Sequence, residues 1–557
     1  MVRSTRSKAN PAVAATKAAP VAKKAATKKA AAKKAAPAPK TKKRDTKAAA
    51  KQKAKDDDKK VKDAKSSQSD DDEEEKKDLV VRNTAMSNGV MVDHLVPNPG
   101  AHEVVKSNGM VLNCNLMFSD CGNNNNKFYI CQGLKSGGSY YLWARWGRVG
   151  VDGQSSKQLM GSESGLYSIF NKKLNQKKSK GYTQIEISYD DVDETTKKLS
   201  EKEKKKDKKP KKGSKLPEST QNLLKFIFDM KMIEKSMVKV GFNVKKMPLG
   251  KLSKDTVKMG YEVLKKIETC LNKKADKSEL SQLSSEFYRY IPHDFKFQHM
   301  SNFIINTKDK LKDKRDLVET LADIQIAAEI SNEVDDEDND TNELDAKYSK
   351  MKCKIEPIDP SAPEYDDLMK TVTTTHGATH GFKINPKEIF EIKREGEEER
   401  YNSKIGNKKL LWHGSRFSNW GGILSQGLRI APPEAPVTGY MFGKGVYFAD
   451  IVSKSAQYCC SYLSNNEGLL ALCEVACGDH NELMSASYTA GNLPKNTFST
   501  KGCGKWVPNT EVQIKGINAY HGPLSDLGSK YYLRYNEIIS YDISNIKIKY
   551  LFRCDIG

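Results

Sequence analysis

The sequence predicts a multidomain protein in which a disordered basic N-terminus precedes a small β-rich domain, an all-α helical bundle and an α+β domain. Three observations predict this order: a low-complexity start rich in Ala and Lys, an aromatic block with strand character, and a switch to helical periodicity before strand signals return. The length of 557 residues suits about three to four domains. The expected segments are a tail at 1–89, the β-rich domain at 90–190, a basic linker at 191–215, the bundle at 216–335 and the α+β domain at 345–557.

The tail repeats Ala and Lys with interspersed Pro and almost no aromatic or branched apolar residues. Such a segment cannot bury enough apolar surface to offset its ordering entropy, so it is expected to be disordered. With the net charge of +23, its lysines favour binding to phosphates through counterion release. The run PKTKKR at 39–44 has the composition of a nuclear localisation signal, although it also fits a solvated Lys-rich tail.

The β-rich domain is predicted from FYICQ at 128–132 and SYYLWARWGRV at 139–149, which are rich in aromatic and β-branched residues. The runs NNNN at 123–126 and KSGGS at 135–139 are typical of turns between strands. A helical pattern follows at 161–175. The block therefore predicts a hairpin-based sheet with one helix.

Apolar residues then recur with the period of a helix. In chain order, the stripes are Leu223, Ile227, Met230, Ile233, Met237 and Val240; Val257, Tyr261, Leu264, Ile267 and Leu271; Phe287, Tyr288 and Ile291; and Leu317, Leu321, Ile324 and Ala328. The acidic stretch at 333–343 is expected to be a linker or exposed loop. Beyond it, short apolar strands are predicted at 445–448, 469–476 and 511–514, and alternation of Ile and Tyr with Lys at 546–550 predicts a half-exposed strand.

Several classes of protein are excluded by composition. No apolar run approaches the roughly 18 residues that span a bilayer, and the N-terminus lacks the apolar core of a secretory signal. The eleven cysteines contain no C-x-x-C pair and no zinc-finger spacing, so we expect reduced, structural thiols and no metal. These features predict a protein of the cytosol or nucleus with no membrane partner, and the run at 39–44 favours the nucleus.

Four motifs in the last domain are specific: LWHGSR at 411–416, GLRIAPPEAPVTGYMFGKGVYFAD at 427–450, SKSAQY at 453–458 and YNEI at 535–538. Together they resemble the catalytic domain of poly(ADP-ribose) polymerases. The WGR run at 146–148 resembles the WGR domain, and 216–330 is similar to the helical regulatory domain of that family. The resemblance covers roughly 90–557 and matches the short, DNA-dependent members. It implies an ADP-ribosyltransferase fold for the α+β domain and NAD⁺ that is consumed as substrate.

The reaction implied by this resemblance needs little acid catalysis. The bond that breaks in NAD⁺ joins a ribose to a cationic nicotinamide, which departs neutral, unlike the leaving group of an ordinary glycoside. One carboxylate is then enough to stabilise an oxocarbenium-like ribose and to position an acceptor hydroxyl. By resemblance, that carboxylate is Glu537, and His413 and Tyr447 complete the centre of the site. No G-x-G-x-x-G fingerprint of a dinucleotide-binding unit is present.

The other pocket residues follow from the resemblance. His413 and Ser415 are expected at the ribose on the adenosine side, and Tyr447 and Tyr458 on the two faces of the pyridinium ring. The remaining positions are Gly414 and Ser455 at the carboxamide, Gly422 and Arg429 at the adenosine end, and Lys454 near the reacting ribose.

In the WGR block, Trp146 is expected to stack on an exposed base or sugar at a DNA strand end, with Arg145 and Arg148 reaching phosphates. The alternative is that Trp146 belongs to the core and the arginines to its rim. The implied partners are DNA with strand breaks, acceptor proteins that include the chain itself and histones, and an accessory factor at the active site. In the resembled family the helical domain covers the NAD⁺ pocket and opens when DNA binds.

The expected function is therefore NAD⁺-dependent poly(ADP-ribosyl)ation activated by DNA strand breaks in DNA repair. Two alternatives remain: a mono-ADP-ribosyltransferase and a non-enzymatic chromatin-binding protein. Retention of Glu537 argues against the first alternative and the intact pocket against the second. Two departures from the family pattern bear on the accessory factor: Ile538 stands where an aromatic residue is common, and the run after Tyr550 is shorter and more polar than usual.

Overall fold

The computed structural model describes residues 86–188, 213–239, 251–333 except 275 and 297, and 342–557. The expected disordered tail, the signal at 39–44 and most of the basic linker and acidic stretch lie outside these ranges. Among the described residues, no helix has the length and apolar character needed to cross a membrane, and no three His, Cys, Asp or Glu side chains are grouped to hold a metal ion. All eleven cysteines are unpaired.

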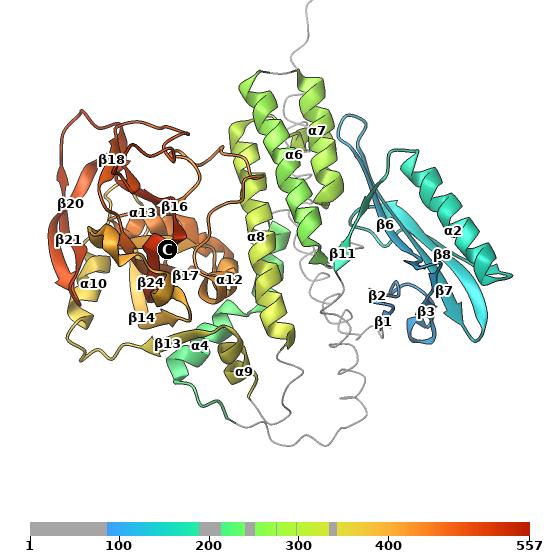
Figure 1. The fold of residues 1–557 in the computed structure, drawn as a ribbon, viewed down its shortest axis with the longest axis horizontal. Helices are drawn as coiled ribbons and strands as arrows, with labels where there is room; N and C mark the ends of the chain where they lie inside the picture. The colour runs from blue at the N-terminus through green and yellow to red at the C-terminus, as the bar shows by residue number, and fades with distance from the viewer. Residues whose placement is uncertain (1–85, 189–212, 240–250, 275, 297, 334–341) are drawn as a thin grey trace, which may run out of the picture. The chain divides into compact units, whose positions relative to one another are not determined.

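The first domain is a sheet whose hairpins follow the predicted aromatic strands (Figure 1). Its elements are β1 (Met86–Ser87), β2 (Val90–Met91), β3 (Glu103–Val104), β4 (Lys106–Ser107), β5 (Met110–Val111), β6 (Asn113–Asp120), β7 (Asn125–Ser136), β8 (Ser139–Arg148), β9 (Gln154–Met160), α2 (Glu163–Lys178), β10 (Thr183–Ile185) and β11 (Ile187–Ser188). The sheet has the order β10-β6-β7-β8-β9, with β3 pairing β7. The strands extend into the predicted turns, because Asn125 and Asn126 belong to β7 and only Gly137 and Gly138 separate β7 from β8. Both glycines have positive φ, which a tight hairpin turn requires.

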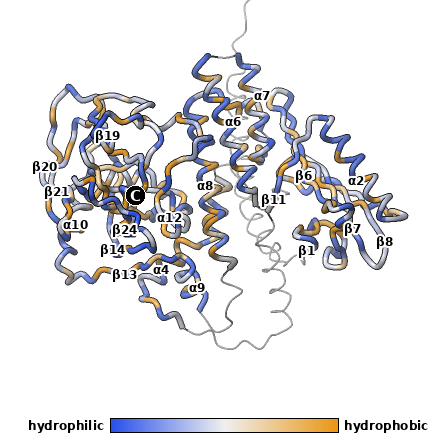
Figure 2. Tube along the Cα trace, in the orientation of Figure 1, coloured by the Kyte–Doolittle hydropathy of each residue, from blue (hydrophilic) through white to orange (hydrophobic). Residues whose placement is uncertain are grey.

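The second domain is helical, as the apolar stripes predict. Its elements are α4 (Glu218–Ile227), α5 (Met230–Lys239), β12 (Lys251–Leu252), α6 (Lys254–Asn272), α7 (Lys277–Tyr290), α8 (Lys308–Glu333) and α9 (Glu343–Lys350). The first predicted stripe is divided between α4 and α5, because the Asp229 carboxylate accepts the Met232 amide at 2.9 Å and starts a new helix. Figure 2 shows hydrophilic and hydrophobic residues alternating along α6 and α8. Their apolar sides meet in one buried cluster.

The third domain is mixed. Its elements are β13 (Cys353–Pro357), α10 (Tyr365–Thr373), β14 (Ile384–Arg394), α11 (Glu397–Arg400), β15 (Lys408–Ser415), α12 (Trp420–Gln426), β16 (Val446–Phe448), α13 (Val452–Ala456), β17 (Glu467–Ala476), β18 (His480–Leu483), β19 (Ser499–Gly502), β20 (Gly504–Ile514), β21 (Ile517–Asp526), β22 (Leu533–Tyr535), β23 (Glu537–Ser540) and β24 (Ile546–Ile556). One sheet has the order β13-β14-β24-β17-β15-β21-β20-β22, and a second has the order β16-β23-β19-β18. The predicted fold class, with a strand-rich domain, a helical domain and an α+β domain, is confirmed.

The prediction of a half-exposed strand at 546–550 is wrong. β24 lies between β14 and β17, so both of its edges are paired, and consecutive residues along it are buried, so both of its faces are covered. Lys547 is 7% exposed, and its ammonium lies 3.1 Å from the Glu474 carboxylate and 3.0 Å from that of Glu398. The alternation at 546–550 thus reflects a buried ion pair, since a buried charge is retained only when it is paired.

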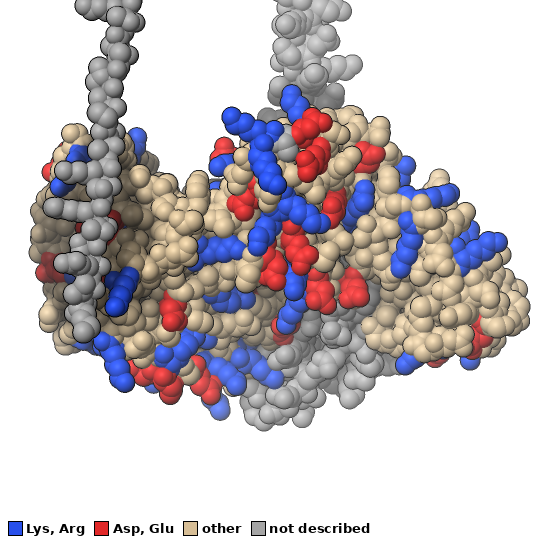
Figure 3. Space-filling model, turned by 45° about the horizontal axis from the view of Figure 1, so that its top comes forward, with Lys and Arg blue, Asp and Glu red and all other residues tan. Residues whose placement is uncertain are grey.

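One face of the molecule does not display the excess of positive charge that the whole sequence carries. Figure 3 shows Lys and Arg intermingled with Asp and Glu on the face that it presents. Many of the lysines belong to 1–85 and 189–212, outside the described residues. Binding of an anionic partner to this face therefore depends on local clusters of side chains.

Candidate active site

The first wall of the site is the end of β15, which carries His413, Gly414 and Ser415. The strand lies between β17 and β21, and Trp412 exchanges backbone hydrogen bonds with Ala449 at 2.8 and 3.0 Å. This bridge fixes β16 beside the end of β15. Two motifs that are separated in sequence, 411–416 and 427–450, thereby form one surface.

His413 is held in a single tautomer. Its Nδ1–H donates to the carbonyl oxygen of Tyr447 at 3.0 Å, since a carbonyl can only accept. Nε2 is left with a lone pair that can accept a hydroxyl proton. Burial lowers the pKa of His413, with the Tyr447 hydrogen bond as a smaller opposing effect. The imidazole is therefore neutral at physiological pH and suited to accept from a ribose hydroxyl.

The neutral state of His413 predicts how the KM for NAD⁺ depends on pH. Because the pKa of His413 is lowered, the KM for NAD⁺ is expected to stay flat from about pH 8 to pH 6, where an ordinary histidine begins to protonate. At lower pH, Nε2 gains a proton and the KM should rise. Initial rates at several NAD⁺ concentrations and pH values measure this. A KM that rises between pH 7 and pH 6 would contradict the assignment.

Gly414 allows α13 to approach β15. A Cβ at Gly414 would lie 2.0 Å from the backbone carbonyl oxygen of Ser455. The Ser455 hydroxyl donates to the Trp412 carbonyl oxygen at 2.9 Å, which fixes α13 on the strand. The two residues predicted to share one function are thus in direct contact.

The Gly414→Ala variant is expected to lose NAD⁺ binding and stability together. The added methyl group meets backbone, which cannot turn aside as a flexible side chain can, and overpacking of this kind costs about 1–3 kcal/mol or more. Thermal unfolding and KM for NAD⁺ measure both effects. Gly381→Ala is the matched control, because a Cβ there meets nothing within 4 Å. Equal behaviour of the two variants would contradict this account.

The two tyrosines and Glu537 are neighbours. The Tyr447 hydroxyl donates to the Gly443 carbonyl oxygen at 2.7 Å and accepts the Phe442 amide at 2.9 Å, so its ring is fixed. The Tyr458 side chain is 54% exposed. Burial raises the pKa of Tyr447 above its usual value, and burial together with the Glu537 carboxylate raises that of Tyr458 to about 12; the same carboxylate adds to the shift of Tyr447. One carboxylate therefore lies near both side chains.

Glu537 begins β23 and is held by Lys454. The Lys454 ammonium lies 2.8 Å from the Glu537 carboxylate and donates to the carbonyl oxygens of Tyr535 and Asn536 at 3.3 and 2.9 Å. Burial lowers the pKa of Lys454, and the charge of Glu537 opposes that effect. The lysine thus links the end of β22 to α13 and holds the carboxylate in one orientation.

A cavity of about 320 Å³ opens beside this pair. It is lined by Thr379, His380, Lys454, Gln457, Leu533, Arg534, Tyr535 and Glu537. Sequence reasoning missed His380, whose Nδ1 lies 2.8 Å from the Ser453 hydroxyl, and Arg534. The paired histidines of HGATHG at 376–381 were the available signal, but their distance in sequence from Glu537 concealed the contact.

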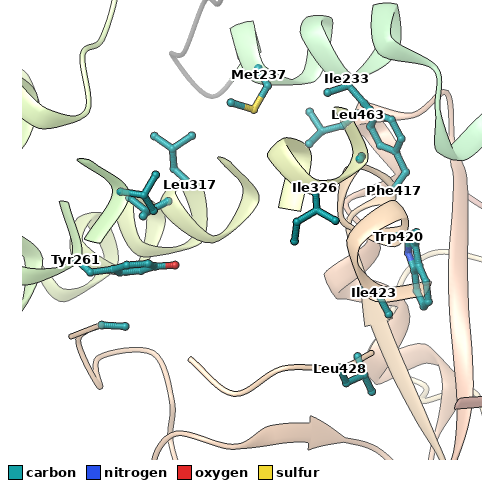
Figure 4. Close-up of a cluster of buried hydrophobic side chains, with 14 of the residues drawn as sticks. Ile233, Met237, Tyr261, Leu317, Ile326, Phe417, Trp420, Ile423, Leu428 and Leu463 are labelled. Carbon is teal, nitrogen blue, oxygen red and sulfur yellow. The ribbon is translucent and has the colours of Figure 1, made fainter. Parts of the chain in front are cut away.

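α8 covers Gly422 and Arg429, the two residues predicted for the adenosine end. Arg429 pairs with Asp323, and a Cβ at Gly422 would lie 3.0 Å from the Asp323 carboxylate. Nearby, the Tyr440 hydroxyl donates to Glu319 at 2.5 Å. Figure 4 shows the buried apolar cluster behind these contacts, in which Ile326 of α8 meets Phe417 and Trp420. Arg429 and Gly422 therefore contact the helical domain in this structure.

The predicted DNA-binding residues do not share one face of β8. Successive side chains on a strand point to opposite sides, so Arg145 lies on the other face from Trp146 and Arg148. Arg145 is 2% exposed, and its guanidinium donates to the Asp93 carboxylate at 2.7 Å and to the Asp152 carbonyl oxygen at 2.9 Å. The expectation that Arg145 reaches phosphates is not met, because its charge is neutralised inside the domain.

Trp146 is half-buried and stacks on Tyr129, with ring centroids 6.3 Å apart. The Lys177 ammonium lies 4.0 Å from the centroid of the Tyr129 ring and 5.0 Å from that of Tyr182. Burial lowers the pKa of Lys177, and the neighbouring Lys180 and Lys173 add to the effect. This cluster joins residues of β7, β8 and α2, so no local sequence pattern could indicate it.

The comparisons with known proteins agree with this geometry. Three family models match: the poly(ADP-ribose) polymerase catalytic domain at 362–556, the poly(ADP-ribose) polymerase regulatory domain at 214–348 and the WGR domain at 112–189. Poly [ADP-ribose] polymerase 2-A of Oryza sativa subsp. japonica is 42% identical over 457 residues, covering 78% of this chain and 68% of the relative. The chain belongs to the poly(ADP-ribose) polymerase family. It is therefore an NAD⁺ ADP-ribosyltransferase, and NAD⁺ is its substrate.

Other relatives in this family differ in how much of their length is matched. Poly [ADP-ribose] polymerase 2 of Homo sapiens is 38% identical over 463 residues, covering 77% of each chain. Poly [ADP-ribose] polymerase of Drosophila melanogaster is 36% identical over 503 residues, which are 86% of this chain and 49% of the relative. The family assignment thus covers all three described domains.

Proposed function

We propose that this chain forms poly(ADP-ribose) on acceptor proteins, including itself and histones, in the nucleus, and that DNA strand breaks activate it in DNA repair. The observation that carries the proposal is the position of Glu537. Its carboxylate is paired with Lys454 at 2.8 Å, lines a solvent-accessible cavity and lies near enough to Tyr447 and Tyr458 to raise the pKa of both. A carboxylate between a donor pocket and a cavity for a second substrate suits chain elongation as well as first transfer.

The pocket holds NAD⁺ through a division of roles. Tyr447 and Tyr458 stack on the nicotinamide ring, and Gly414 and Ser455 bind its carboxamide. Neutral His413 accepts a hydroxyl of the adenosine-side ribose through Nε2. Ser415, Gly422 and Arg429 complete the adenosine end. Stacking and hydrogen bonds orient the substrate before the bond to nicotinamide breaks.

The transfer step uses charge more than acid catalysis. As nicotinamide leaves, positive charge develops on the ribose, and the Glu537 carboxylate stabilises it. The same carboxylate can accept the proton of an acceptor hydroxyl that approaches through the cavity. Lys454 positions Glu537 and does not need to transfer a proton itself.

We propose that the helical domain acts as a gate over the donor pocket. The Asp323 carboxylate forms an ion pair with the Arg429 guanidinium, and the Arg315 guanidinium donates to the Thr438 carbonyl oxygen at 2.7 Å. Glu268 of α6 accepts the backbone amides of Val437 and Thr438 at 3.0 and 2.5 Å. These contacts cover the residues assigned to the adenosine end, so they must separate before NAD⁺ enters fully.

The WGR domain contacts the same helical domain, which supports coupling of DNA binding to the gate. Arg148 donates to the carbonyl and side-chain oxygens of Asn124 at 3.1 and 3.3 Å, and the Met300 amide donates to that side-chain oxygen at 3.1 Å. The Asn126 side chain donates to the His293 carbonyl oxygen at 2.8 Å. A DNA end that engages Arg148 would compete for these hydrogen bonds, so the two sites are energetically linked.

The proposal is tested by incubating the full chain with labelled NAD⁺, with and without nicked DNA, and separating the products on a gel. A DNA-dependent ladder of products is the expected result. A single shifted band would support mono-ADP-ribosylation, and a ladder that forms equally without DNA would contradict the gate. Absence of label would contradict both proposals.

Lys177 lies beside the Tyr129 ring on which Trp146 stacks, so we assign it the phosphate contact in place of Arg145, and two substitutions test this. Lys177→Gln is expected to reduce the slope of log DNA affinity against log salt concentration by about one, because one fewer counterion is released on binding. Fluorescence anisotropy at several salt concentrations measures this slope. Arg145→Gln should leave that slope unchanged but destabilise the domain by about 3–5 kcal/mol, because the buried Asp93 carboxylate loses its partner. Thermal unfolding measures the second effect. If Arg145→Gln lowers the salt dependence of DNA affinity and Lys177→Gln does not, Arg145 is the phosphate contact.

A further inference from the structure

A surface of aromatic and basic side chains adjoins the Glu537 cavity at the end of the eight-stranded sheet. We define the edge patch as Lys505, Lys530, Tyr531, Tyr532 and Arg534. Tyr532 is 84% exposed, and Lys530 and Arg534 are also exposed. A tyrosine ring this open to water, beside a second tyrosine and exposed basic side chains, is available to an external binding partner.

The backbone places the edge patch in continuity with the cavity. β22 is the last strand of its sheet and pairs in parallel with β20 through Gly504 and Leu533. Arg534 belongs to β22, and Tyr532 lies at the bend directly before this strand begins. Arg534 itself lines the cavity beside Glu537. A chain that leaves the cavity past Arg534 can therefore reach the bend that carries Tyr532.

The charges of the edge patch favour an anion. The Lys505 ammonium is paired with the Asp526 carboxylate at 3.0 Å, and both side chains are more than a third exposed. Within the described residues, no salt bridge is formed by Lys530 or Arg534, so two positive charges face solvent. The Lys530 ammonium lies 4.9 Å from the centroid of the Tyr531 ring. Cation and ring are thus close enough to hold a phosphate and a base together.

We propose that the edge patch binds ADP-ribose units of the growing poly(ADP-ribose) chain next to the unit in the cavity. The inference rests on the proposed polymerase function and extends it to the path of the product. Each unit offers an adenine, which can stack on Tyr532 or Tyr531, and a pyrophosphate, which can pair with Lys530 or Arg534. An acidic protein segment would use the charges but leave the rings unused, and the cavity produces ADP-ribose polymer at this place.

Holding the chain near Glu537 makes elongation processive. The Lys530→Ser/Tyr532→Ser double variant removes one charge and one ring without touching residues assigned to NAD⁺. With DNA present, its initial rate of nicotinamide release is expected to stay within about twofold of wild type, while chains become shorter and more numerous at equal NAD⁺ consumption. Loss of one stacked base and one phosphate contact should shorten the median chain at least about threefold. Lys530→Arg/Tyr532→Phe keeps charge and ring and should give chains of wild-type length.

A second measurement tests binding without polymerisation. An ADP-ribose trimer bearing a photoreactive adenine is cross-linked to the full chain without NAD⁺, and the labelled peptide is identified by mass spectrometry. Labelling at 527–534 is expected in wild type and in the conservative double variant, and its loss is expected in the serine double variant. This readout does not depend on other basic segments of the chain, because it reports the position of the contact.

The outcomes separate this inference from the proposed function. Unchanged chain length in the serine variant, or labelling of the trimer away from 527–534, overturns the edge patch while leaving the polymerase intact. If wild type attaches only single units but the trimer still labels 527–534, the polymerase proposal fails and the ADP-ribose site stands. A single-stranded oligoadenylate that displaces the trimer at lower concentration than poly(ADP-ribose) would assign the edge patch to RNA and overturn the inference.

Discussion

Replacing Glu537 by glutamine is expected to lower the rate of chain elongation about a hundredfold or more, while NAD⁺ still binds. The amide keeps the size and hydrogen-bonding reach of the carboxylate but loses its charge, which is the part that stabilises a cationic ribose. Lys454 loses its counter-ion, and burial then lowers the pKa of Lys454 further. Products on a gel measure elongation, and calorimetric titration with a non-hydrolysable NAD⁺ analogue measures binding.

The matched control for this variant is Glu482→Gln. Glu482 pairs with Lys501 at 2.9 Å in the same small sheet, but its side chain is 53% exposed, so its loss should change neither rate nor binding. A Glu537→Gln variant that still produced long chains would remove the assigned role of the carboxylate. Loss of NAD⁺ binding together with elongation would make Glu537 a binding residue rather than one specific to the transfer step.

Replacing Asp323 by alanine is expected to raise turnover without DNA about tenfold or more. The substitution frees Arg429 and removes a buried carboxylate that packs on Gly422, so the closed arrangement loses stabilisation that the open one does not need. The maximal rate with nicked DNA should stay near that of wild type, because the gate is already open there. Nicotinamide release with and without DNA measures both quantities.

Asp313→Asn is the control for the gate, since Asp313 is an exposed carboxylate on the same helix. It should leave both rates unchanged. Equal basal rates in Asp323→Ala and wild type would exclude the Asp323–Arg429 contact as part of the gate. A fall in the DNA-stimulated rate would instead indicate that Asp323 supports the fold of the donor pocket.

Much of the fold followed from periodicity, because apolar spacing is a local property. The stripe from Val257 to Leu271 lies on α6, and the aromatic runs at 128–132 and 139–149 became β7 and β8. The prediction failed at 546–550, where Lys547 alternates with apolar residues and yet is buried. Its partner Glu474 is 73 residues away in sequence, so no local pattern could show that the charge is compensated.

The site was predictable as a set of residues but not as a set of contacts. The motifs named Lys454 and Glu537 separately, whereas the 2.8 Å pair between them follows from how α13 meets β23. Arg429 was expected at NAD⁺, but its pairing with Asp323 required the helical domain to be placed. Arg145 was predicted to contact DNA together with Trp146 and Arg148, but the alternation of side chains along β8 places it on the opposite face of the strand. The roles of these residues remain predictions that the variants above test.

Main-chain atoms form part of the contact between the hairpin of β6 and β7 and helix α7, beside side-chain contacts such as the Ser119 hydroxyl, which donates to the Tyr288 carbonyl oxygen at 3.3 Å. Ser119 and Cys121 meet α7 through a backbone carbonyl oxygen, which accepts from Arg289 at 3.2 Å, and a backbone amide, which donates to the Ser285 hydroxyl at 2.9 Å. These two main-chain contacts depend on the course of the hairpin and not on the side chains of Ser119 and Cys121. They can therefore persist where those side chains change.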